Sequence, residues 1–107
     1  MIARVLYTKK ASKTTFAIVD AGFTDLIRPA LYGAYHKIEN LTSLSQETDI
    51  YDVVGPICES TDVFVEDYKM PVTQRGDLLA FRSAGAYGEI MASRYNLRDL
   101  AKAYFFE

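Results

Sequence analysis

Short segments in which β-branched and aromatic side chains alternate dominate this sequence. In TTFAIVD, residues 14–20, Phe16 and Ile18 fall on one face and Ala17 and Val19 on the other, because successive side chains of a strand point to opposite sides. A period of two with this composition is typical of a β-strand. The same kind of pattern occurs in four further segments: ARVLYTKK (3–10), YDVVGPI (51–57), DLLAFRS (77–83) and AKAYFFE (101–107).

Turn-forming residues separate these segments, and helical signals are short. The stretch TDLIRPAL, residues 24–31, predicts one helical turn capped by Thr24 or Asp25 and interrupted by Pro29. A second short helix or loop is expected near the start of residues 87–104. The expected fold class is therefore mainly β: an antiparallel, Greek-key-like barrel or sandwich with one or two short helices, forming one domain over residues 1–107.

The size and charge of the chain narrow the possible function classes. With 107 residues the chain holds one modest core, and half of its residues are apolar. A formal net charge of -2 gives no electrostatic reason to expect nucleic acid or an anionic membrane as a partner. The single cysteine cannot form an internal disulfide, and the apolar runs are too short for a signal peptide or a membrane span. We therefore expect a soluble, cytoplasmic protein.

The segment IRPALYGAYH, residues 27–36, places a forked cation and a phenol four positions apart. Arg28 and Tyr32 flank Pro29, which stiffens the stretch. A guanidinium beside a phenol suits a carboxylate ligand. The same residues also fit a purely structural role, with Arg28 in a surface ion pair and Tyr32 half-buried.

The segment GPICESTD, residues 55–62, places Cys58 directly beside Glu59. In a strand the two side chains would point to opposite faces, so they can serve one pocket only at a strand end or in a loop. The Gly55–Pro56 pair favours such an irregular segment. Alternatively, Cys58 is a small buried hydrophobe, which is the usual role of a free cysteine.

Small residues surround Tyr87 in RSAGAYG, residues 82–88, and would let a ligand approach the backbone closely. A tight turn with a packed tyrosine explains the same pattern. His36 is the only histidine, and no partner lies at metal-ligand spacing beside it, so we predict no metal site.

Four motifs, in their order along the chain, resemble the C-terminal part of the diaminopimelate decarboxylases, which are pyridoxal-phosphate enzymes of the alanine-racemase-like fold type. The motifs are VDAGFTDLIRPALYGAYH (19–36), VVGPICESTD (53–62), GDLLAFRSAGAYG (76–88) and SRYNLR (93–98). The likeness extends from Val5 to Arg98. It implies a two-domain subunit in which an N-terminal (β/α)8 barrel holds pyridoxal phosphate on a lysine and a C-terminal β-domain helps to close the active site. This chain matches only the second domain, so the cofactor lysine lies elsewhere and we expect the isolated chain to be inactive.

The resemblance also implies roles for the candidate residues. Conversion of meso-diaminopimelate to L-lysine and CO2 leaves one amino-acid end of the substrate intact, so the enzyme must recognise a carboxylate and an ammonium at that far end. Arg28 fits the carboxylate and Glu59 the ammonium. By resemblance, Tyr32 lines the substrate site and Tyr87 reaches both cofactor and substrate.

Cys58 and Glu59 are implied to cross a homodimer interface into the partner's active site. Cys58 would then lie near the reacting carbon as a candidate proton donor. Two alternatives stay open. The first is a related decarboxylase acting on ornithine, arginine or carboxynorspermidine. Ornithine and arginine have no far carboxylate for Arg28 to bind. A stand-alone β-domain would instead bind a partner, or regulate a full-length homologue, without catalysis.

Overall fold

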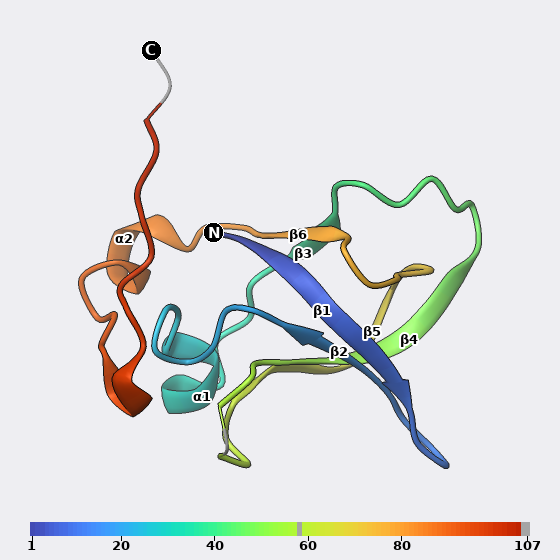
Figure 1. Cartoon of the computed structure of the whole chain (residues 1–107), viewed down its shortest axis with the longest axis horizontal. Coiled ribbons are helices and arrows are strands. Elements are labelled where there is room, and N and C mark those ends of the chain that lie inside the picture. The colour runs from blue at the N-terminus through green and yellow to red at the C-terminus, as the bar shows by residue number, and fades with distance from the viewer. Residues whose placement is uncertain (58, 106–107) are drawn as a thin grey trace.

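Strands make up most of the regular structure (Figure 1). The computed structural model describes residues 1–57 and 59–105, and the side chains of residues 86 and 87 also lie outside the description. The strands of this part of the chain are β1 (Ile2–Lys10), β2 (Thr15–Val19), β3 (Ile38–Asn40), β4 (Thr48–Val54), β5 (Val63–Pro71) and β6 (Leu78–Phe81). The helical segments are α1 (Arg28–Tyr32), α2 (Gly85–Gly88) and a 3-10 turn, η1 (Tyr95–Leu97). The expected mainly-β class with short helices is confirmed.

The strands form one sheet in the order β3-β6-β1-β2-β4-β5, which curls into a nearly closed barrel. All neighbouring pairs are antiparallel except β2 and β4, which run parallel with Phe16 opposite Asp52. The expectation of a purely antiparallel sheet was therefore wrong. A parallel pair needs a crossover of about a dozen residues or more, and residues 20–47, which contain α1 and β3, supply it.

A side chain joins the two edge strands of the sheet. The hydroxyl of Tyr68, in β5, accepts a hydrogen bond from the Ile38 N–H and donates one to the Ile38 carbonyl, each at 3.1 Å. Ile38 begins β3, at the other edge of the sheet. The phenol therefore bridges the edges where a backbone ladder would close a complete barrel, and it occupies polar groups that an open edge leaves unpaired.

The barrel interior is filled by the inward-facing positions of the strands. Ala17 and Val19 of β2 are fully buried, whereas Phe16 and Ile18 are only partly covered, so the predicted alternation is confirmed. The large apolar side chains below 2% exposure are Phe81, Leu26, Leu79, Val5, Val19 and Val53. Phe64 and Phe81 pack with ring centroids 4.7 Å apart in a tilted arrangement. These contacts form a single core.

Two local predictions differ from the structure. The segment 101–105, expected to be part of a strand, has no regular structure, and Tyr104 and Phe105 are 78% and 88% exposed. A strand needs a neighbour with free backbone groups, and the barrel's edges already face each other through Tyr68. Pro29 does not interrupt a helix but lies in the first turn of α1, where its missing N–H removes no intrahelical bond. No helix in the described residues is long and apolar enough to cross a bilayer.

Candidate functional site

Segments that are far apart in the sequence meet at one end of the barrel. We call them the loop cluster, defined as residues 20–36, 55–62, 82–88 and 93–98. Figure 1 shows the corresponding elements, α1, the β4–β5 connection, α2 and η1, gathered at this end. The sequence singled out each segment separately, and the tertiary structure brings them together.

Asp62 is the anchor of the β4–β5 connection. It is 3% exposed, and its two carboxylate oxygens accept hydrogen bonds from the backbone N–H groups of Phe23, at 2.8 Å, and Ile57, at 2.7 Å. Its carbonyl accepts a third from Gly55 at 2.9 Å. A Cβ on residue 55 would lie 2.6 Å from the Asp62 Cγ, so only glycine allows this close approach.

The charge state of Asp62 reflects this burial. Desolvation raises the pKa of the carboxyl group, and the N–H groups of Ile57 and Phe23 and the charge of Arg98 act in the opposite direction without cancelling it. A carboxylate that is buried and already bonded on both oxygens is not available to a ligand. Asp62 was noted in the sequence beside Glu59 without a predicted role, and the structure shows that it anchors the turn that carries Glu59.

Glu59 lies at the exposed tip of this connection. Its N–H donates to the Ile57 carbonyl at 2.8 Å, and its carbonyl accepts from the Asp62 N–H at 3.1 Å, so the turn holds its backbone. The Tyr95 hydroxyl donates to Glu59 Oε1 at 2.5 Å. This hydrogen bond and the charge of Glu59 raise the pKa of the Tyr95 phenol. Glu59 is therefore an oriented carboxylate that remains open to solvent.

The segment 93–98 is tied to residues 20–25 at both of its ends. The Ser93 N–H donates to the Thr24 carbonyl at 2.8 Å, and Arg98 Nη2 donates to the Asp20 carbonyl at 2.6 Å. Between these bonds, the Tyr95 ring packs against Phe23 with centroids 5.5 Å apart. These contacts hold segment 93–98 against residues 20–25 within the loop cluster.

Arg28 and Tyr32 are neighbours on α1, as their spacing predicted. The Arg28 guanidinium carbon lies 5.6 Å from the centroid of the Tyr32 ring, a cation–π distance. Arg28 is partly exposed and Tyr32 is 63% exposed. The helix α1 packs against β5, and Figure 1 shows α1 and the β4–β5 connection at the same end of the barrel. Neither Arg28 nor Glu59 is enclosed in the core.

The structure does not describe all of the predicted site residues. Cys58 lies outside the described residues, and Tyr87 is in α2 with a side chain that is not described. The backbone next to Tyr87 joins the loop cluster closely, because a Cβ on Gly88 would lie 2.9 Å from Leu26 Cδ1. His36 Nδ1 is 2.9 Å from the Arg82 carbonyl, which links the same segment to residues 20–36.

The loop cluster thus offers a guanidinium, a carboxylate and phenols at one accessible end. Such a set can bind a ligand that carries both a carboxylate and an ammonium group. Among the residues that the structure describes, no three His, Cys, Asp or Glu side chains form a group able to hold a metal ion.

Sequence reasoning missed the contributions of Tyr95 and Phe23. SRYNLR was noted as a motif, but nothing in its spacing indicates that a residue 36 positions away from Glu59 would bond to it. Only a tertiary contact reveals this pair.

Residues 1–85 match the family model described as pyridoxal-dependent decarboxylase, C-terminal sheet domain. The diaminopimelate decarboxylase of Bacteroides thetaiotaomicron is 62% identical over 104 residues, which cover 97% of this chain and 27% of that protein. The solved diaminopimelate decarboxylase of Helicobacter pylori, complexed with L-lysine, matches with a TM-score of 0.83 and 48% identity over 91% of this chain and 24% of that one. The corresponding M. jannaschii structure, also with L-lysine, has a TM-score of 0.86 and 39% identity, covering 91% of this chain and 22% of that one. The chain therefore spans about a quarter of the length of these relatives.

Proposed function

The chain belongs to the family of C-terminal sheet domains of pyridoxal-dependent decarboxylases, and on that premise we propose that it is the substrate-recognition domain of a diaminopimelate decarboxylase. The full-length protein would convert meso-diaminopimelate to L-lysine and CO2, and the isolated domain would be inactive. Support comes from the 62% identical relative of that name and from the solved relatives that hold L-lysine. L-lysine is the product of the proposed reaction.

The observation that carries the proposal is that a guanidinium, Arg28, and a carboxylate, Glu59, belong to elements that gather at the same end of the barrel. The far end of diaminopimelate is doubly ionised, and enclosing either charge without a partner would cost several kcal/mol. Arg28 would bind the far carboxylate through its planar fork of donors, and Glu59 would bind the far ammonium. Tyr32 would line the same site. A substrate without the far carboxylate, such as ornithine, would offer the Arg28 guanidinium no carboxylate to bind.

No lysine of this chain lies in a site suited to holding pyridoxal phosphate as an imine. All six lysines of the chain are exposed, whereas a lysine that forms an imine is activated by burial or by a nearby cation. When bound, the cofactor supplies the electron sink for the carbanion that loss of CO2 generates. We therefore assign the cofactor lysine to an N-terminal (β/α)8 barrel elsewhere in the full-length protein, and we assign substrate binding and orientation to this domain.

The surface of the domain fits a role within a larger assembly. An apolar groove of about 740 Å³ runs between the first strand, α2 and the C-terminal segment, and its lining includes Met1, Ala84 and Leu100. Contact with the barrel domain would cover this groove. In a homodimer, the β4–β5 connection would deliver Glu59 and Cys58 to the partner's active site, with Cys58 as the proton donor. Tyr87 would approach the cofactor and the substrate, and the enzyme would work in the cytoplasm.

Alanine substitutions in the full-length protein test this proposal. Arg28→Ala and Glu59→Ala should each lower kcat/KM for meso-diaminopimelate at least about tenfold, since each leaves a substrate charge unpaired. The absorbance of the bound cofactor should not change.

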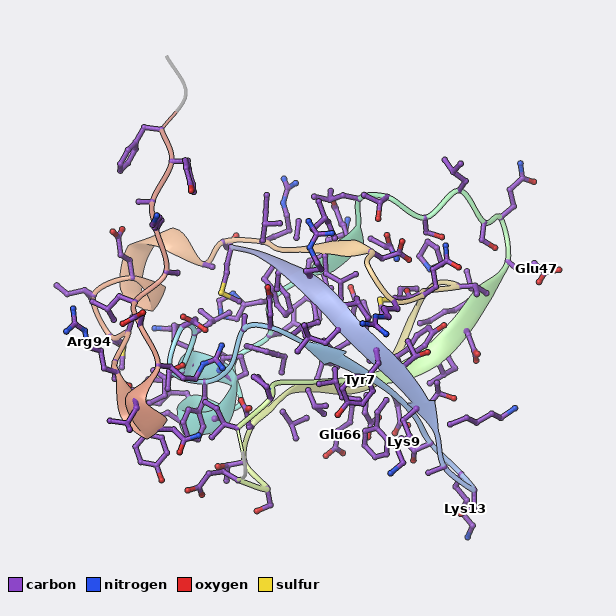
Figure 2. All side chains as sticks on the ribbon, viewed as in Figure 1. Tyr7, Lys9, Lys13, Glu47, Glu66 and Arg94 are labelled. Atoms are coloured by element: carbon purple, nitrogen blue, oxygen red, sulfur yellow. The ribbon has the colours of Figure 1, made fainter. Side chains whose placement is uncertain are left out.

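Matched controls are Arg75→Ala and Glu47→Ala, which remove exposed charges outside the loop cluster. Figure 2 shows Glu47 far from Arg94, which belongs to the cluster. Wild-type kcat/KM in both site variants, or higher activity of the wild type on ornithine, would contradict the proposal.

A further inference from the structure

We infer that Tyr95 is a positioning residue for Glu59: its hydroxyl holds one carboxylate oxygen and leaves the other to bind the far ammonium of the substrate. The inference deepens the proposed function and rests on it. The observation behind it is the 2.5 Å bond from the Tyr95 hydroxyl to Glu59 Oε1. This distance is typical of a hydroxyl that donates to a charged carboxylate.

The chemistry of a phenol suits this role. A carboxylate has two oxygens and about four acceptor sites, so one bond to Tyr95 leaves room for an ammonium group. The phenol is neutral, and it therefore orients Glu59 without cancelling the charge that attracts the ligand. A lysine or arginine in the same place would compete with the substrate for the carboxylate.

The donor is held in place before any ligand arrives. The Tyr95 ring packs on Phe23, and the Phe23 N–H is bonded to Asp62. Asp62 also donates its own N–H to the Glu59 carbonyl. Asp62 thus holds the backbone of Glu59, and Tyr95 holds the side chain of Glu59. Phe23 connects the two, because it contacts both Asp62 and Tyr95. Ordering a free, exposed glutamate would otherwise reduce the affinity for the substrate, because each immobilised side chain loses rotamer entropy.

The test removes only the hydroxyl. In the full-length protein, Tyr95→Phe keeps the ring against Phe23 and should raise KM for meso-diaminopimelate about five- to tenfold, the equivalent of one ordinary hydrogen bond, with kcat within about twofold. 2-Aminopimelate, which lacks the far ammonium, should be turned over equally well by wild type and variant. The control is Tyr7→Phe, which removes an exposed hydroxyl from β1; Figure 2 shows Tyr7 away from the segment that carries Arg94.

A second substitution separates positioning from general structural damage. In a Glu59→Ala background, Tyr95→Phe should cause no further loss, because the group it positions is absent. A wild-type KM in Tyr95→Phe, an equal loss with 2-aminopimelate, or an additive loss in the double variant would overturn the inference while leaving the proposed function intact. A wild-type protein without activity on meso-diaminopimelate would overturn both.

A measurement with Tyr95 unaltered covers the case in which Tyr95→Phe does not fold. With 3-fluorotyrosine at position 95 alone, 19F spectroscopy follows the titration of this phenol in the full-length protein. Because Glu59 raises the pKa of Tyr95, Glu59→Gln should lower it. An unchanged pKa would mean that the two groups do not interact, and the inference would be wrong.

Discussion

Replacing Asp62 by asparagine should destabilise the domain, although the two side chains have nearly the same shape. Asp62 accepts one backbone N–H on each of its two oxygens, from Phe23 and from Ile57. Asparagine offers a single acceptor oxygen, so one of these N–H groups would face an NH2 group with no acceptor.

The size of the effect follows from that lost bond. A buried N–H left without a partner costs about 1–3 kcal/mol. The relief of a buried charge offsets part of this cost, because burial already raises the pKa of Asp62. We expect a net loss of about 1.5 kcal/mol in the free energy of unfolding, which lowers Tm by about 6 °C in a domain of this length.

The chain contains eight tyrosines and no tryptophan, so urea unfolding can be followed by tyrosine fluorescence and by circular dichroism. Asp99→Asn is the matched control, because Asp99 is exposed. The urea midpoint should fall in Asp62→Asn with an unchanged slope, and it should stay at the wild-type value in Asp99→Asn. If both variants unfold within about 0.5 kcal/mol of wild type, the anchoring role of Asp62 is refuted.

Two further outcomes follow from close contacts and from titration. Gly55→Ala should destabilise the domain by more than about 1 kcal/mol, because its Cβ would overlap the Asp62 carboxylate. Gly85→Ala is the control: residue 85 has open space around it, so its urea midpoint should equal that of wild type. Equal midpoints for the two variants would contradict the close approach of Gly55 to Asp62. Burial raises the pKa of Asp77, but bonds from Gln74, Asn40 and Thr42 outweigh it and lower the pKa below 3.8. The folded state therefore binds this proton less tightly than the unfolded state, and the stability that Asp77 contributes above about pH 4 is lost as pH falls through the lowered pKa. The stability difference between wild type and Asp77→Asn should shrink from pH 6 to pH 2.5, and a constant difference would show that Asp77 is not linked to acid unfolding.

Local patterns in the sequence predicted the local parts of this structure. Alternation in residues 14–20 predicted the strand β2 and separated its two faces, since a strand carries its pattern in consecutive residues. The structure shows that the face with Ala17 and Val19 is the buried one. The spacing of Arg28 and Tyr32 likewise predicted that the guanidinium and the phenol would lie near one another, and the structure places both on one short helix. In each case the interacting residues lie within one turn or one strand.

Local patterns were insufficient where several partners compete for one segment. The closing apolar residues 101–105 have strand-like composition but no available strand to pair with. Pro29 was expected to interrupt a helix because its effect depends on position, and the structure places it in the first turn, where it is tolerated.

By itself, the sequence determined the strand-rich class, the alternating faces of β2 and the motifs that mark the loop cluster, because these depend on neighbours along the chain. Tertiary structure alone decided the parallel pairing of β2 with β4, the Tyr68 bridge to Ile38 and the bond from Tyr95 to Glu59. Those contacts join residues 30 or more positions apart, and no periodicity encodes them. They arise only when closing the chain into a barrel brings distant loops to the same end.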